Sequence, residues 1–164
     1  MEAEVWPDPR VEALVNENFL PARLHVREDA ADYQRIGQRY SVQWTPTTLL
    51  LDPAGVERHR IEGFLPAHDF MAQLTLGLGH LALRAERWSD AERWYAQVLK
   101  QFPDTDAAPE ALYWAGVSRY KAGNDPGALA ATVKAFETRY QDSSWAKKAS
   151  VWKQPAPRQP AATS

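Results

Sequence analysis

The 164-residue sequence contains no cysteine. This absence excludes disulfides, thiolate catalysis and cysteine-based zinc sites, and it removes the usual indicator of an oxidising or a reducing compartment. On this ground the cytoplasm and the periplasm are equally open; the lack of a signal peptide, described below, makes the cytoplasm the default, and the periplasm remains possible if the start is truncated. Long apolar runs are also missing, because no segment approaches the roughly 18 apolar residues of a membrane-spanning helix. We therefore expect no insertion into a membrane.

An excess of charge of one sign is missing as well. The formal net charge is −2 at pH 7, which provides no global attraction to nucleic acid or to an anionic membrane surface. The first residues, Met1–Arg10, do not place an apolar run after a basic one, so they do not read as a signal peptide. The four histidines are scattered, and none has a histidine four positions later. We therefore predict no metal site and no cofactor.

Residues 1–80 alternate between helical and strand patterns. Helices are predicted to start at Pro9, to span Glu28–Tyr40, and to open at Pro66. Strands are predicted over Leu20–Val26, Thr47–Leu51 and Val56–Ile61.

The last two predicted strands form a hairpin around the turn Asp52–Gly55, where proline and glycine suit the turn conformation. Thr47–Leu51 is apolar and β-prone, which is typical of a fully buried strand. Alternation along Val56–Ile61 predicts that His59 lies at the surface.

From about Leu74 onward, helical patterns follow one another. Gly79 and Ala91 recur 37 positions later as Gly116 and Ala128, where small residues let two antiparallel helices approach closely. A repeated helix pair of this period is typical of a helical solenoid. Larger residues are predicted to fill the remaining seam: Tyr95, Val98, Leu112 and Phe136.

The first of these units resembles a tetratricopeptide repeat. The positions that match its small and large residues are Leu78, Gly79, Ala91, Tyr95 and Pro103. The second unit departs from the pattern at Thr132 and Tyr140. Two repeats fall short of the three or so that a free-standing solenoid needs, so we expect them to lean on the preceding α/β layer. Ser143–Trp152 is predicted to be a terminal capping helix.

Residues 1–80 resemble a thioredoxin-like domain. Tyr40–Asp52, with the sequence YSVQWTPTTLLLD, is similar to the stretch of that family that leads into the strand after a cis-proline. Met1–Val11 matches the run that follows the Cys-x-x-Cys pair, and Asn18–Val26 matches the next strand. Gly63 matches the end of the last strand.

The implied fold class is α/β plus all-α. An incomplete thioredoxin-like βαββα layer, truncated at its N-terminus, is expected over residues 1–73. A short tetratricopeptide-like helical hairpin array is expected over residues 74–152, and a disordered tail over residues 153–164.

The resemblance begins too late to supply the central strand that leads into the cysteine pair. A missing central strand leaves buried N–H and C=O groups without partners, at about 1–3 kcal/mol each. Three solutions are open: the flanking strands close up, a second copy donates an edge, or the natural start lies upstream. We hypothesise that Met1 is an internal methionine and that the cysteines lie before it. An in-frame stop codon directly before Met1 in the genomic DNA would contradict this.

The resemblance singles out Trp44, Thr45 and Pro46 as a groove for a substrate or a peptide. A cis Pro46 holds the Thr45 backbone N–H and C=O toward solvent, where an extended peptide pairs by strand addition. The alternative is a trans proline at the first residue of a strand. Trp44 either forms one wall of the groove or covers the core.

A second candidate surface lies on the helical repeats and involves Tyr113, Arg119 and Lys121. The alternative for this surface is a solvated helix face that is supported by ion pairs one turn apart.

Two functions follow. The first is a redox-inactive thioredoxin-like and tetratricopeptide-like module that binds a protein or peptide partner without a covalent step. The second is the C-terminal part of a thiol–disulfide oxidoreductase of the thioredoxin family, whose Cys-x-x-Cys lies upstream of Met1. The chain as written, without cysteine, is not expected to be an enzyme, and its open sheet centre invites a homodimer.

Overall fold

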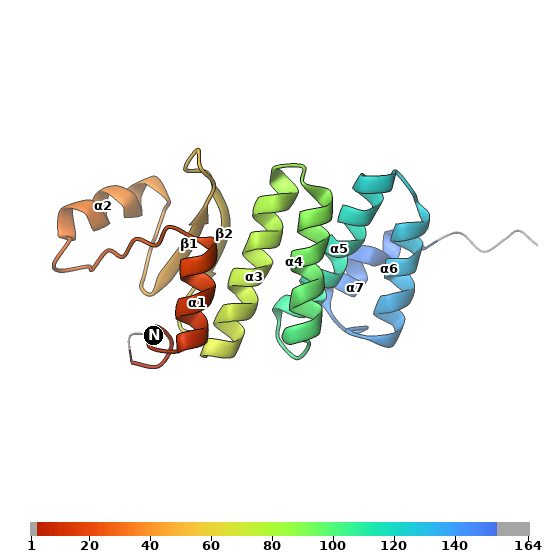
Figure 1. Ribbon diagram of the computed structural model, residues 1–164, viewed down its shortest axis with the longest axis horizontal. Coiled ribbons are helices and arrows are strands. Elements are labelled where there is room, and N and C mark those ends of the chain that lie inside the picture. Colours follow the sequence, from red (N-terminus) through yellow and green to blue (C-terminus); the bar gives the residue numbers. More distant parts are fainter. Residues whose placement is uncertain (1–2, 154–164) are drawn as a thin grey trace, which may run out of the picture.

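The structure is a computed structural model that describes residues 3–153. A two-stranded antiparallel sheet is followed by a row of helices along the long axis of the molecule (Figure 1). The strands are β1 (Thr47–Leu51) and β2 (Glu57–Glu62). The helices are α1 (Pro9–Asn18), α2 (Ala30–Arg39), α3 (Ala67–Arg84), α4 (Trp88–Gln101), α5 (Ala107–Gly123), α6 (Gly127–Thr138), α7 (Ser144–Ala149) and the 3-10 helix η1 (Ser150–Trp152).

The hairpin turn forms where the sequence predicts it. The Asp52 carboxylate accepts hydrogen bonds from the backbone N–H groups of Ala54 and Val56, at 2.9 and 3.0 Å. Gly55 has a φ of 74°, in the left-handed region that glycine adopts without penalty. The register is irregular between Leu50 and Leu51, beside the turn.

One face of the sheet packs against α3. Leu50 and Ile61 are buried there, and Gly77 of α3 comes so close that a Cβ on it would lie 2.2 Å from Leu50 Cδ2. The prediction of a fully buried strand over Thr47–Leu51 is wrong. Leu50 alone is buried in this strand, and the Leu51 side chain is 39% exposed. The physical reason is that α3 covers only one side of the sheet.

The strand predicted over Leu20–Val26 does not form. This segment lies outside the helices and strands, and Leu20 is fully exposed. A strand needs a neighbour for its backbone N–H and C=O groups, whereas β1 pairs only with β2 in the described part of the chain. The predicted βαββα order is therefore reduced to two strands.

Helix α2 stands apart from the other helices and strands (Figure 1). It corresponds to the helix predicted over Glu28–Tyr40. Two hydrogen bonds tie its end to the hairpin: the Tyr40 hydroxyl donates to the Gly55 carbonyl at 2.8 Å, and Arg60 donates to the Tyr40 carbonyl. One side of α2 is thus left without a packing partner among residues 3–153.

Helices α3 to α6 form two antiparallel hairpins with the same internal spacing. A Cβ added to Gly79 would lie 2.3 Å from Tyr95 Cε1, and one added to Gly116 would lie 2.1 Å from Thr132 Oγ1. The predicted close approach at these two glycines is confirmed, because their neighbours stand where a side chain would otherwise be. The predicted seam residues are all buried: Tyr95, Val98, Leu112 and Phe136.

The predicted terminal helix forms as α7 and η1, which pack against α5 and α6. Ser143 caps it by accepting a 3.1 Å hydrogen bond from the Ala146 N–H. The expected disordered tail lies outside the described residues, apart from Lys153. No helix between residues 3 and 153 combines the length and apolarity needed to cross a membrane.

Candidate functional site

The segment before β1 carries the predicted groove residues. Trp44 is 62% exposed, and Thr45 and Pro46 are exposed. The Thr45–Pro46 peptide bond is cis. Two hydrogen bonds hold the segment: Thr47 Oγ1 donates to the Trp44 carbonyl at 2.9 Å, and the Gly63 N–H donates to the Pro46 carbonyl at 2.8 Å.

The outer edge of β1 has open backbone groups. The bond between Gly63 and Pro46 extends the pairing of β1 with β2 by one position. Because hydrogen-bonded and non-bonded positions alternate in an antiparallel ladder, Thr47 and Leu49 direct their N–H and C=O groups away from β2. The Thr45 backbone has no hydrogen-bond partner in the described part of the chain either. Thr45, Thr47 and Leu49 thus form one open edge, named here the β1 edge.

Exposed apolar side chains gather on the same half of the molecule. Among the described residues, Val151 is the only large, exposed hydrophobic side chain beyond residue 64. The others are Trp6, Leu20, Leu24, Val26, Trp44, Leu51, Val56 and Phe64.

The residues of the second predicted surface lie along α5 and make separate contacts. Tyr113 stacks on Trp152 with ring centroids 4.5 Å apart and also contacts Trp145. Arg119 instead forms an ion pair with Glu92 of α4, at 2.7 Å. Lys121 is exposed near the end of the helix. No hydrogen bond, ion pair or ring contact joins any two of these three side chains within residues 3–153, and their role as a binding surface stays a prediction.

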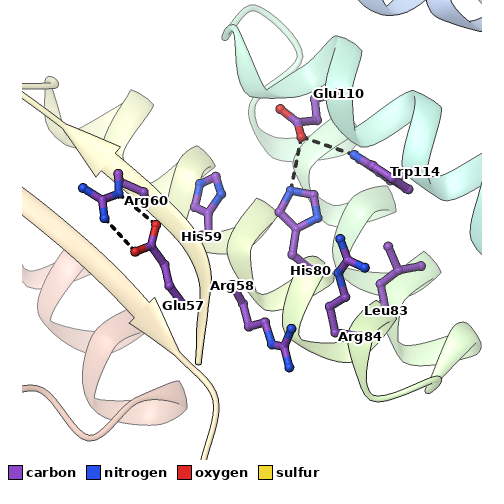
Figure 2. A pocket seen from close by; sticks show the side chains of 9 residues that line it. All are labelled: Glu57, Arg58, His59, Arg60, His80, Leu83, Arg84, Glu110 and Trp114. Carbon is purple, nitrogen blue, oxygen red and sulfur yellow. Dashed lines mark hydrogen bonds and ion pairs between the residues drawn. The ribbon is translucent and has the colours of Figure 1, made fainter. Parts of the chain in front are cut away.

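A cleft that no sequence pattern indicates lies between β2, α3 and α5 (Figure 2). Its volume is about 360 Å³. No local motif could have revealed it, because its residues come from three elements that are far apart in the sequence. The lining residues are Glu57, Arg58, His59, Arg60, His80, Leu83, Arg84, Glu110 and Trp114.

A chain of hydrogen bonds crosses the floor of this cleft. His80 Nδ1 lies 2.8 Å from the Tyr95 hydroxyl, and His80 Nε2 lies 3.2 Å from Glu110 Oε1. Trp114 Nε1 donates to the same Glu110 oxygen at 3.2 Å. Both ring nitrogens of His80 thus have a partner, the Tyr95 hydroxyl at Nδ1 and the Glu110 carboxylate at Nε2. This series of side-chain hydrogen bonds joins α3, α4 and α5.

His59 lies at the inner wall of the cleft. Its Nε2 lies 2.9 Å from Gln73 Oε1, and its ring centroid is 5.3 Å from that of His80. The prediction of a surface position is wrong. Ile61, two residues further on, is buried against α3, and residues two apart in a strand share a face.

Burial and neighbouring groups shift three pKa values around the cleft. Burial lowers the pKa of His59, and the nearby His80 lowers it further. Burial raises the pKa of the Tyr95 hydroxyl far above its ordinary value. Burial alone would raise the pKa of Glu110, but hydrogen bonds from His80 and Trp114 outweigh it and hold the pKa below its ordinary value. Glu110 is therefore a carboxylate at neutral pH.

The acidic groups around the cleft are already paired. Glu57 receives Arg60 through both carboxylate oxygens, at 2.8 and 2.7 Å. Asp52, at the start of the hairpin turn, holds Arg58 at 2.7 Å. Arg84 is exposed at the end of α3 and forms no ion pair within residues 3–153. No group of three or more acidic or histidine side chains in this part of the chain is arranged to hold a metal ion.

Comparison with known proteins gives one family match, in the first half of the chain. Residues 1–77 match the family model of a thioredoxin-like domain. This match agrees with the resemblance stated for residues 1–80 and with the hairpin and helix that follow Pro46. Neither the curated proteins nor the solved structures gave a match to this chain.

Proposed function

We propose that this chain is a protein-binding module that captures an extended segment of a partner along the β1 edge. The observation that carries the proposal is the row of open backbone groups at Thr45, Thr47 and Leu49. Strand addition supplies affinity through main-chain hydrogen bonds and specificity through side-chain contacts. Trp44, 62% exposed beside the edge, offers a large apolar surface to the first residues of such a segment. No covalent step is involved.

The helical part supports this role as a scaffold. In this proposal the thioredoxin-like domain covers residues 1–73, and residues 74–152 form a short tetratricopeptide-like array. The hairpins α3–α4 and α5–α6 share one spacing and one kind of glycine contact, which favours that assignment. The proposed boundary falls inside α3, so this helix belongs to both parts.

The test uses peptides selected from a random phage-displayed library and then synthesised. Bound peptide should protect the Thr45, Thr47 and Leu49 amides from hydrogen exchange. Trp44→Ala should weaken binding at least about tenfold, which is the usual weight of a buried aromatic anchor. Trp6→Ala removes the same kind of side chain elsewhere and should leave affinity unchanged. Protection confined to other amides, or equal affinities for the two variants, would refute the proposal.

A second candidate function is the C-terminal part of a thiol–disulfide oxidoreductase of the thioredoxin family. It is favoured by the match over residues 1–77 and by the strand-like composition of Leu20–Val26, a segment that lies outside the helices and strands. A strand carrying Cys-x-x-Cys and encoded upstream of Met1 would pair with both this segment and the β1 edge.

Insulin reduction by dithiothreitol separates the two functions. The 164-residue chain has no thiol and should not exceed the uncatalysed rate. A longer product of the same gene that gains turnover would favour the oxidoreductase.

A further inference from the structure

The cleft between β2, α3 and α5 has an excess cation at its mouth. Each acidic group that faces it is engaged: Glu57 with Arg60, and Glu110 with His80 and Trp114. Arg84 has no such partner in the described part of the chain and is the one lining arginine left without an acid. The helix dipole favours a cation at the last turn of α3, which accounts for the position of Arg84. It does not occupy the five N–H donors of the Arg84 guanidinium.

A second arginine, Arg58, lines the same cleft. Figure 2 shows the Arg84 guanidinium beside His80, whereas the Arg58 side chain extends away from the His80 ring. Arg58 uses its Nε and Nη2 atoms on a single oxygen of Asp52, at 2.8 and 2.7 Å. Its Nη1 atom is not used in this pair. The two guanidinium groups come from different elements, β2 and α3.

We propose that the cleft is a binding site for an oxyanion, a carboxylate or a phosphate group. A planar guanidinium donates two parallel hydrogen bonds to such a group, and Arg84 is the guanidinium available to do so. Leu83 and Trp114 supply apolar wall for the carbon part of the ligand. The volume of about 360 Å³ lies within the range of small-molecule pockets. This site is separate from the β1 edge and does not depend on the proposed peptide binding.

The test follows the Trp114 indole N–H by nuclear magnetic resonance at low ionic strength. Its signal is assigned by its loss in Trp114→Phe. The probes are inorganic phosphate and an acetylated, amidated Glu-Glu dipeptide. We expect a saturable shift of the indole signal with at least one probe. A response to phosphate identifies a phosphate ligand, and a response to the dipeptide identifies a carboxylate ligand.

Two variants decide whether the response belongs to Arg84. Arg84→Gln should weaken the binding at least about tenfold, which corresponds to one lost charge-assisted contact. Lys121→Gln removes one positive charge from an exposed position on α5 outside the cleft and should leave the affinity unchanged. The proposed site is refuted if neither probe gives a saturable shift. It is also refuted if Arg84→Gln binds the probe as tightly as the parent protein, or if Lys121→Gln loses as much affinity as Arg84→Gln. Because Arg84 is exposed, its replacement leaves the core intact.

Discussion

The ring of Tyr95 occupies the space that a side chain at position 79 would fill. Tyr95 is completely buried in α4, and its Cε1 atom lies 2.3 Å from where a Cβ on Gly79 would stand. One hairpin later, Thr132 stands in the same relation to Gly116. Each hairpin thus depends on one glycine that admits a larger residue from the next helix.

Gly79→Ala should destabilise the protein, because the added methyl group collides with a buried ring that has no room to move. Overpacking of this kind lowers the free energy of unfolding by about 1–3 kcal/mol. Gly123→Ala is the matched control, since its Cβ would meet only Asp125 Cβ at 4.0 Å, and alanine favours a helix. Urea unfolding followed by circular dichroism measures both. Equal stability of Gly79→Ala and the parent chain would contradict the packing.

Tyr95→Phe should also be destabilising, because it removes the hydroxyl that satisfies His80 Nδ1. A buried acceptor left without its donor loses about 1–3 kcal/mol. Tyr120→Phe removes a hydroxyl that has no hydrogen bond within residues 3–153 and should change little. The same urea titration compares the two variants. If they proved equally stable, the hydrogen-bond chain through His80 would not contribute to folding.

Stability should fall with acid in two steps. The pKa of His59 in the folded protein is lowered below its ordinary 6.5, so the unfolded chain binds the proton more readily and stability falls as the pH drops below 6.5. The pKa of Glu110 is lowered below 4.5, so the stability that its carboxylate provides above pH 4.5 is lost as the pH falls further.

The first step can be isolated with a substitution. His59→Gln should remove a loss of up to about 1.4 kcal/mol between pH 7.5 and pH 5.5. His25→Gln, which removes an imidazole from the segment before α2, should keep that loss. Urea unfolding of the three proteins at the two pH values provides the comparison. An unchanged pH dependence in His59→Gln would show that another group titrates in this range.

Tyr140→Phe should loosen the contact between the two hairpins. The Tyr140 hydroxyl donates a 2.7 Å hydrogen bond to the carbonyl of Pro103, which holds the equivalent position one unit earlier. Because this bond is solvent-exposed, we expect a loss of only about 0.5–1 kcal/mol. Tyr120→Phe again serves as the control. A larger loss than that of Tyr95→Phe would reverse the ranking that burial predicts.

Local signals predicted most of the elements. Asp52–Gly55 carries its turn chemistry in four consecutive residues, and Gly79 recurs at a fixed spacing, so both could be read from the chain. Leu20–Val26 has the composition of a strand but joins no sheet in the described part of the chain, and pairing is a property of the whole sheet. The groove residues Trp44–Pro46 came from a family resemblance.

The cleft could not be predicted, because it depends on how β2 lies against α3. The sequence places His59, His80 and Glu110 far apart, and no spacing relates them. The position of His59 was misjudged for a related reason. The side of β2 that faces inward is the side of Ile61, which packs on α3, and His59 shares it. Taking Val56 as an inward residue would place His59 on the opposite side, but Val56 is exposed.

Helix α3 touches the sheet through Gly77 and α4 through Gly79, only two residues apart. Helix α3 is therefore part of the packing of both the sheet and the helical row. Removing either half would leave one packed side of α3 without its partner. Limited proteolysis should therefore yield no stable fragment that ends inside α3.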